Sequence, residues 1–290
     1  MILAVASGKG GTGKTSVAAS LALSWPGPVA AVDLDVEEPN LHLLLHPQPG
    51  GGQGAYLEVP SADEALCIAC GACAELCQYK AISLLGETLL VFPEMCHGCG
   101  GCLAVCPSGA LRPGQRELGQ VLWGRAGDIA VYQGRLRVGE AMSPPLMRSV
   151  MTQVRADGAE IKGDVIIDAP PGVSCPAVTA VSQAEAILLV TEPTPFGLYD
   201  FSLAWQAFAP LGRPLAAVIN RAGVGDRKVY AFCADHGIPI LAEIPYDRAV
   251  AEAYSRGVPA CRASSELAGL FQRLAQDCRA LVGGREAAHA

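Results

Sequence analysis

The chain has 290 residues, of which 51% are hydrophobic and 17% are charged, and its formal net charge is −7. This apolar content allows a sizeable core and excludes a disordered chain, and the length fits one large domain or two unequal ones. The acidic balance argues against a nucleic-acid partner, because surfaces that bind phosphate backbones carry a basic excess. No apolar run reaches about 18 residues, so we expect no membrane span.

The chain opens with a pattern typical of a βαβ unit. Residues 1–7 (MILAVAS) form an apolar run with no preceding basic residues. This predicts a buried strand rather than a signal peptide, and hence a cytoplasmic protein. We expect a helix over residues 15–24 and a second strand, VAAVDLD, over residues 29–35. A strand, a helix and another apolar strand imply a parallel sheet.

The loop between the first strand and the helix reads GKGGTGKT and fits the pattern G-x-x-x-x-G-K-[ST] of phosphate-binding loops. Its glycines let backbone N–H groups turn inward around phosphate oxygens, and the helix N-terminus adds a favourable dipole. Lys14 would reach the β- and γ-phosphates, and the Thr15 hydroxyl would hold Mg²⁺. The expected nucleotide-binding residues are Gly8, Lys9, Gly10, Gly11, Thr12, Gly13, Lys14, Thr15 and Ser16.

A second lysine, Lys9, follows the first glycine of this loop. The run K-G-G-T-G-K-T, residues 9–15, resembles the deviant Walker A motif of the MinD/ParA family of ATPases, which includes the nitrogenase iron protein. The resemblance implies ATP as the nucleotide and a dimer held together by ATP, either a homodimer or a heterodimer with a paralogue. It also implies that Lys9 stabilises charge on the partner's nucleotide; a solvated loop lysine is the alternative.

Two carboxylates, Asp33 and Asp35, follow at the end of the second strand, where ligands bind in open α/β folds. This stretch resembles switch I of the MinD family. The resemblance implies that Asp35 orients or deprotonates the attacking water and that Asp33 supports Mg²⁺ through its waters. Helix capping or solvated loop acids are the alternative.

Residues 61–113 hold eight of the 12 cysteines and lie between Gly/Pro-rich flanks at 47–54 and 107–114, which predicts an inserted domain. The eight cysteines form two runs with the same C-x₂-C-x₂-C-x₃-C spacing. This spacing is typical of bacterial ferredoxins with two [4Fe–4S] clusters, in which the fourth cysteine of each run binds the other cluster. We therefore assign one cluster to Cys67, Cys70, Cys73 and Cys106, and the other to Cys77, Cys96, Cys99 and Cys102.

Two other interpretations of these cysteines are weaker. Zinc sites with four cysteines usually present two separated C-x₂-C pairs, and disulfides are not expected in a chain without a leader.

Cys175 lies seven residues after Asp168 and is similar in position to a cluster ligand of the nitrogenase iron protein. No cysteine between residues 107 and 174 matches the second ligand of that shared cluster.

The rest of the chain returns to alternating strands and helices. Residues 115–140 predict a hairpin with Gly134 in its turn. Further helices are expected at 145–156, 198–208 and 229–236, and strands at 165–170, 186–193, 215–221 and 239–245. A last amphipathic helix predicts core packing rather than a membrane anchor, and the tail 283–290 is expected to be frayed.

Two of these later strands end in polar residues. VIIDAPPG, residues 165–172, resembles the Walker B and switch II segment, which implies that Asp168 contacts Mg²⁺ through water. Asn220 ends the strand LAAVINR, and Gly223 stands where a guanine-specific enzyme would place its aspartate. The resemblance implies that Asn220 contacts adenine and that residues 244–247, which include Pro245, close over the base; a structural asparagine is the alternative.

The expected fold is an α/β P-loop NTPase with a mostly parallel sheet flanked by helices, plus an inserted small α+β ferredoxin-like domain. The expected ATPase domain comprises residues 1–60 and 114–282, with the insert at 61–113. The resemblance to MinD-superfamily ATPases with a ferredoxin insert implies that ATP-dependent dimerisation is coupled to electron transfer to a redox partner protein. The alternatives are an ATPase for iron–sulfur or metal-cofactor assembly, and an ATP-switched positioning or scaffold protein with redox-sensing clusters.

Overall fold

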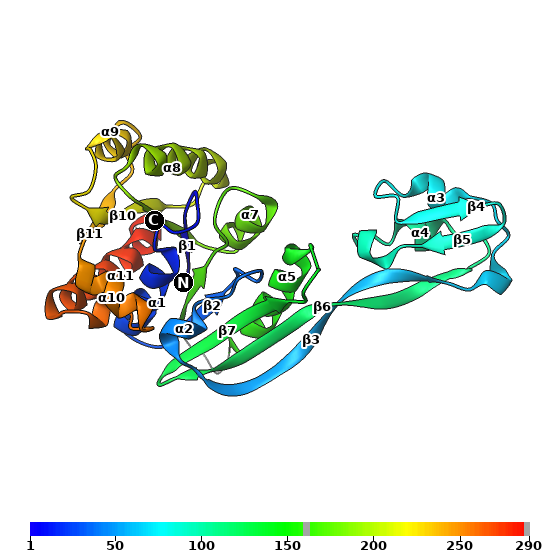
Figure 1. The fold of residues 1–290 in the computed structure, drawn as a ribbon, viewed down its shortest axis with the longest axis horizontal. Helices are drawn as coiled ribbons and strands as arrows, with labels where there is room; N and C mark the ends of the chain where they lie inside the picture. The colour runs from blue at the N-terminus through cyan, green and yellow to red at the C-terminus, as the bar shows by residue number, and fades with distance from the viewer. Residues whose placement is uncertain (159–162, 287–290) are drawn as a thin grey trace. The chain divides into compact units, whose positions relative to one another are not determined.

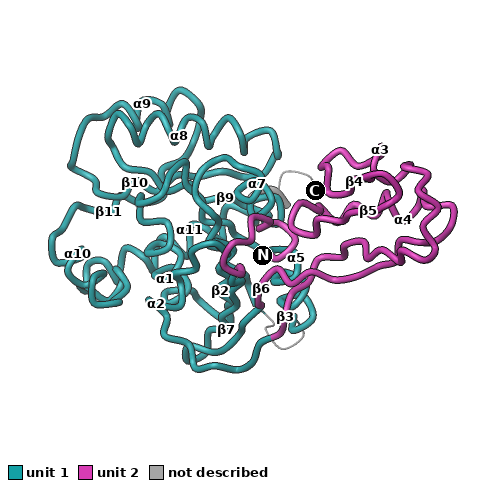
Figure 2. Tube along the Cα trace, turned by 45° about the vertical axis from the view of Figure 1, so that its right-hand side comes forward, with its two compact units in different colours: residues 1–52, 121–135, 147–290 teal, residues 53–120, 136–146 magenta. Residues whose placement is uncertain are grey.

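The computed structural model describes residues 1–158 and 163–286, which form two compact units (Figure 2). The first unit comprises residues 1–52, 121–135 and 147–290, and the second comprises residues 53–120 and 136–146. The chain therefore leaves the first unit and returns to it.

A parallel sheet forms the centre of the first unit (Figure 1). The strand order is β11-β10-β9-β1-β8-β2-β7-β6-β3, and all printed pairings from β11 to β7 are parallel. These strands are β1 (Ile2–Ala6), β2 (Val29–Asp33), β7 (Ile129–Leu136), β8 (Asp164–Asp168), β9 (Ala186–Thr191), β10 (Leu215–Ala222) and β11 (Ile240–Pro245). β2 and β9 are buried along their whole length, as is typical of a sheet covered on both faces.

Helices cover both faces of this sheet (Figure 1). They are α1 (Lys14–Ser24), α2 (His42–Leu45), α5 (Ser143–Ala156), α7 (Cys175–Ser182), α8 (Pro195–Phe208), α9 (Lys228–Asp235), α10 (Arg248–Ser255) and α11 (Ser265–Glu286). The apolar side of α11, which includes Phe271 and Leu274, lies in the main core with α1 and the sheet. The prediction of core packing is confirmed, and within the described residues no helix has the length and apolarity needed to cross a membrane.

Two local predictions are wrong. Gly134 lies inside β7, and the hairpin turns instead at Gly127-Asp128, between β6 (Leu111–Ala126) and β7. Gly127 has a φ of 60°, a left-handed conformation that favours glycine and permits the reversal. In the expected tail, α11 continues to Glu286, and only residues 287–290 lie outside the described residues.

The glycine-rich flank at 47–54 forms the first part of a long strand, β3 (Gln48–Ala62). The glycines here serve close approach rather than chain reversal. A Cβ added to Gly51 would lie 2.7 Å from the ring of Trp123. Glycine lets this part of β3 pass directly against a large aromatic side chain, which a larger residue would prevent.

The second unit is small, and few of its apolar side chains are buried together. It contains a hairpin of β4 (Ile82–Leu85) and β5 (Thr88–Val91) and two short helices, α3 (Ala72–Leu76) and α4 (Gly101–Val105). Its buried cluster consists of Cys73, Ile82, Leu89, Cys102 and Leu111. So small a core usually needs disulfides or metals for stability, and all 12 cysteines of the chain are free.

Asp164, at the start of β8, connects three distant parts of the first unit. Its carboxylate accepts hydrogen bonds from the Met1 amino group at 2.8 Å and the Trp25 indole at 2.9 Å, and it pairs with Arg279 at 3.2 Å. Burial raises the pKa of Asp164, but the hydrogen bonds from Met1 and Trp25 outweigh it and hold the pKa below its ordinary value of 3.8. The ionised form is thus favoured by folding.

We expect Asp164→Asn to lower the free energy of unfolding by about 1–2 kcal/mol at pH 7. Because the pKa is lower in the folded state, the contribution is present above pH 3.8 and is lost as the pH falls through the folded pKa. Urea unfolding at about pH 7 and pH 3 checks this, with Asp235→Asn, on an exposed position of α9, as control. An equal loss at both pH values contradicts the prediction.

Candidate functional site

The phosphate loop connects β1 to α1, and its glycines adopt conformations that other residues resist. Gly11 has a φ of 78° and Gly13 a φ of 92°. Gly13 directly precedes α1, so the first N–H groups of the helix face the loop. A Cβ on Gly8 would collide with the backbone carbonyl of Asp200 on α8. The loop is thus closely packed, and the N-terminus of α1 presents its first backbone N–H groups to an anion.

Five of the predicted site residues lie together at the carboxyl ends of the strands. Lys14 Nζ lies 3.1 Å from Asp168 Oδ1, 3.6 Å from Asp35 Oδ2 and 3.5 Å from Thr15 Oγ1. Asp33 on β2 pairs in register with Asp168 on β8. The side chain of Lys14 is almost completely buried, so this is an internal ion-pair network rather than a surface contact.

The acids of this network outnumber its lysine. Burial and the neighbouring Asp168 raise the pKa of Asp33 well above its usual range, although the N–H groups of Leu41 and Asp35 donate to its carboxylate. Burial also raises the pKa of Asp35, to about 6. For Lys14, burial lowers the pKa, but Asp168 and Asp35 outweigh it and raise the pKa. The excess negative charge favours a bound cation.

One buried carboxylate oxygen has an open coordination position. Asp168 Oδ2 is buried and has no hydrogen-bond partner among the described residues. Carboxylate and hydroxyl oxygens are the ligands that Mg²⁺ prefers. Asp33, Asp168 and Thr15 therefore fit a Mg²⁺ ion chemically. Within residues 1–158 and 163–286, however, no three His, Cys, Asp or Glu side chains are arranged to hold one metal ion by themselves.

Lys9 binds an acid of its own chain. Lys9 Nζ lies 2.8 Å from Glu192 Oε1 and 4.0 Å from Asp200 Oδ2. The other oxygen of Glu192 pairs with Arg221 at 2.7 Å, and Arg221 donates to the carbonyl of Gly11 at 3.3 Å. Burial raises the pKa of Glu192, but Lys9 and Arg221 hold it below its ordinary value.

The sequence interpretation did not include Glu192, Arg221 or Asp200. Glu192 lies 183 residues and Arg221 212 residues after Lys9 of the loop, but each lies at or directly after the last residues of a parallel strand. Ligands bind at the carboxyl edge of such sheets. A charged residue at the end of a predicted strand was therefore the sequence signal that could have identified Glu192 and Arg221.

A cavity of about 320 Å³ adjoins the phosphate loop. Asn220 and Pro245, both predicted to contact the base, line it together with Tyr246 and Tyr254. Asn220 Nδ2 donates to the carbonyl of Thr12 at 2.7 Å, and its Oδ1 accepts from the Arg221 N–H. Asn220 therefore supports the loop as well as lining the cavity. Tyr246 and Tyr254, which the sequence interpretation did not single out as site residues, are 62% and 50% exposed and offer aromatic faces to a base.

The second unit contains two cavities lined by cysteines. One is lined by Cys67, Cys70, Cys73 and Cys106, and the other by Cys77, Cys96, Cys99 and Cys102. Each cavity thus combines three cysteines of one run with the fourth of the other run. Two sulfurs accept backbone hydrogen bonds, Cys77 from Ala81 at 3.3 Å and Cys96 from Gly98 at 3.4 Å.

Other residues support the second cavity. The ring of Tyr79 stacks on His97 with centroids 3.6 Å apart, and both line the cavity. The buried Arg116 pairs with Glu140 at 2.7 Å and donates to the carbonyl of Cys96 at 3.3 Å. The sequence interpretation assigned no role to Tyr79 or Arg116. Such contacts leave no local sequence pattern, because their partners lie 18–24 residues away.

One protein-family model covers most of the chain. Residues 3–260 match the model of the CobQ/CobB/MinD/ParA nucleotide binding domain. The chain belongs to this nucleotide-binding family. The MinD cell division ATPase of Pyrococcus furiosus superposes with a TM-score of 0.61 at 24% identity, covering 97% of this chain and 98% of that one. MinD of Pyrococcus horikoshii, solved with Mg-ADP, gives 0.59 at 22% identity, covering 97% of each chain. The predicted α/β P-loop fold is confirmed.

Relatives of this CobQ/CobB/MinD/ParA member include iron–sulfur proteins. An uncharacterised protein of Methanocaldococcus jannaschii is 28% identical over 261 residues, 89% of this chain and 90% of that protein. An iron–sulfur cluster carrier protein of Aquifex aeolicus is 25% identical over 295 residues, 95% of this chain and 66% of that protein. A ferredoxin of Sorangium cellulosum is 37% identical over 79 residues, 24% of this chain and 78% of that protein.

Proposed function

We propose that this protein binds and hydrolyses ATP with Mg²⁺, and that ATP-dependent dimerisation controls electron transfer through two [4Fe–4S] clusters to a partner protein. The observation that carries the redox part is the pair of cysteine-lined cavities in the second unit. The nucleotide part rests on family membership and on the arrangement of the phosphate loop, Lys14 and the three aspartates.

In the proposed hydrolysis, the loop N–H groups and Lys14 bind the phosphates of ATP. Thr15, Asp168 and Asp33 would hold Mg²⁺, which would neutralise charge on the phosphate oxygens. Lys14 then exchanges its carboxylate partners for phosphate oxygens, which frees Asp35 to orient the attacking water or accept its proton. Asp35 is suited to this because burial brings its pKa to about 6, close to neutral pH.

Lys9 provides the proposed connection to the dimer. In the single chain its charge is neutralised by Glu192 at 2.8 Å. Reaching a partner's nucleotide requires Lys9 to leave Glu192, and Arg221 is the remaining cation on that carboxylate. The triphosphate of the partner offers the stronger negative charge, so ATP favours this exchange.

The cysteine cavities fit [4Fe–4S] clusters better than zinc ions. Four-cysteine zinc sites usually present two separated C-x₂-C pairs. Each cavity here is instead lined by three cysteines of one C-x₂-C-x₂-C run and the fourth cysteine of the other run, which is the ligand set of a bacterial ferredoxin cluster. The cysteines are free, and backbone N–H groups donate hydrogen bonds to the sulfurs of Cys77 and Cys96. Both features suit such a cluster. When bound, the clusters supply one-electron chemistry.

Iron–sulfur cluster assembly is the second candidate function. The similarity to the Aquifex aeolicus iron–sulfur cluster carrier protein, over 95% of this chain, favours it. Against it stand the four cysteines at each cavity, because a complete ligand set stabilises a resident cluster rather than one for transfer.

An anaerobic redox titration followed by EPR, with and without MgATP, tests the proposal. We expect MgATP to shift the cluster potentials in the native protein and not in Lys14→Ala. No shift in either protein contradicts nucleotide control of electron transfer. Faster cluster transfer to an apo-ferredoxin with MgATP, in the absence of a shift, supports the assembly function instead.

A further inference from the structure

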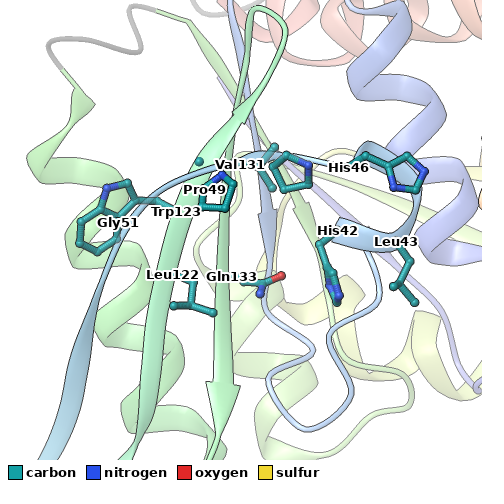
Figure 3. A pocket seen from close by; sticks show the side chains of 11 residues that line it. His42, Leu43, His46, Pro49, Gly51, Leu122, Trp123, Val131 and Gln133 are labelled. Atoms are coloured by element: carbon teal, nitrogen blue, oxygen red, sulfur yellow. The ribbon is translucent and has the colours of Figure 1, made fainter.

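The first unit contains a second cavity that shares no lining residue with the cavity beside the phosphate loop. It has a volume of about 470 Å³ and lies among α2, the start of β3, β6 and β7 (Figure 3). Its walls include Pro49, Leu122, Trp123 and Val131. Sites for small organic molecules are typically of this size, mostly apolar, and contain a few placed polar groups.

Two buried polar atoms belong to this cavity. His42 Nδ1 and Gln133 Oε1 have no hydrogen-bond partner among the described residues, and both side chains line the cavity. Figure 3 shows the amide oxygen of Gln133 on the side of the cavity where His42 lies. Leaving a buried polar atom without a partner costs about 1–3 kcal/mol. A ligand that satisfies these atoms recovers that energy.

The cavity wall supplies no counter-charge from an acid, a lysine or an arginine. The residues that line it, all within the described part of the chain, include two histidines and no Asp, Glu, Lys or Arg. Burial, Arg135 and His46 together lower the pKa of His42, so its ring is neutral at pH 7. Burying a charged molecule without a counter-charge is costly. The matching ligand is therefore uncharged.

The same two polar residues lie next to Asp33 of the nucleotide site. The Leu41 N–H donates to Asp33 Oδ2 at 2.9 Å, and His42 is the following residue, the first of α2. Gln133 on β7 is the register partner of Asp33 on β2. A ligand that reorients His42 or Gln133 therefore acts on the two elements that hold Asp33 in place.

We propose that this cavity is an effector site for an uncharged, mainly apolar small molecule that carries a hydroxyl group, and that its occupancy is coupled to nucleotide binding through Asp33. The hydroxyl donates to Gln133 Oε1, and the aromatic or aliphatic body packs on Trp123 and Leu122. The binding part stands on the cavity alone. The coupling part rests on the proposed nucleotide function.

Calorimetric titration with 1-naphthol and 1-methoxynaphthalene tests the binding part. The two probes share a ring system, but only 1-naphthol has a donor. We expect 1-naphthol to bind about 10-fold more tightly, which corresponds to one hydrogen bond of about 1.4 kcal/mol. This preference disappears in Gln133→Met and persists in the control Gln272→Met, on an exposed position of α11. Equal affinities in the native protein, or an unchanged preference in Gln133→Met, overturn the proposal.

A second variant tests the cavity without disturbing its buried wall. Leu43 lines the cavity and is 51% exposed, so Leu43→Trp is tolerated by the fold and fills the cavity from its open side. We expect it to weaken both probes at least about 10-fold. Unchanged affinity for both probes places them elsewhere and overturns the assignment.

The coupling is measured with saturating MgADP. We expect the affinity for 1-naphthol to change at least about three-fold, and 1-naphthol to change the affinity for MgADP by the same factor, since linkage is reciprocal. Unchanged 1-naphthol affinity with MgADP bound overturns the coupling. Absence of MgADP binding, with the 1-naphthol preference intact, counts against the proposed function and supports the cavity assignment.

Discussion

Replacing Lys14 by alanine is expected to lower the affinity for MgATP at least about 100-fold and to reduce hydrolysis to background. Lys14 is the buried cation of the phosphate loop, and Lys9 is the other lysine of that loop. Without Lys14, phosphate oxygens would approach Asp35 and Asp168 with no compensating charge. Equilibrium binding of a fluorescent ATP analogue measures the affinity, and phosphate release measures the rate of hydrolysis.

The same substitution is expected to destabilise the nucleotide-free protein. Lys14 is a buried ion-pair partner of Asp168 and Asp35, and removal of one partner leaves buried carboxylates uncompensated, at a cost of about 3–5 kcal/mol. A thermal unfolding curve must therefore show that Lys14→Ala is folded at the temperature of the binding measurement.

Lys9→Ala is the matched control, because it lies on the same loop and its side chain is 29% exposed. We expect Lys9→Ala to keep most of the nucleotide affinity and stability while losing hydrolysis, since its proposed role begins only in the dimer. If both variants lose affinity to the same extent, Lys9 binds the nucleotide of its own chain and the proposed role in the dimer is wrong.

Pairs of cysteine substitutions are expected to separate the two proposed clusters. After anaerobic reconstitution we expect about eight iron atoms per chain, and about four in Cys67→Ala or Cys106→Ala. The double variant of these two should still retain about four, because both residues line the same cavity. Cys67→Ala combined with Cys77→Ala should retain almost none, because Cys77 lines the other cavity.

The reverse pattern would contradict the assignment. If Cys67→Ala/Cys77→Ala keeps one cluster and Cys67→Ala/Cys106→Ala loses both, each cysteine run binds its own cluster. Cys175→Ala is the control, since this exposed cysteine lies outside both cavities and should keep the full iron content. Iron analysis and the EPR signal of the reduced protein provide the measurement.

Much of the candidate site could be predicted from short segments. The loop of residues 8–15, with strand and helix on either side, predicted where phosphate-binding groups would lie, and Lys14 does lie among Asp35 and Asp168. Motifs of this kind are local, so their geometry follows from a few neighbouring residues. The apolar strands likewise predicted a parallel sheet buried on both faces, which the strand pairings confirm.

Turns and glycines were predicted less well, because glycine has more than one structural use. Gly134 lies within a strand, whereas Gly127 makes the turn at a φ of 60°. The glycines at 50–52 belong to a strand, where Gly51 gives space to Trp123. Composition does not distinguish a glycine that reverses the chain from one that lets two segments approach.

The sequence by itself determined the family, the parallel sheet, the phosphate loop and the two cysteine runs, because each depends on residues close together in the chain. Only the tertiary structure decided the partner of Lys9, the ion pairs of Lys14 and the cavity beside Asp33. Glu192 meets Lys9 across 183 residues, and Gln133 meets Asp33 across 100. Such contacts follow from strand order and register, and these are set by the packing of the whole sheet rather than by any local pattern.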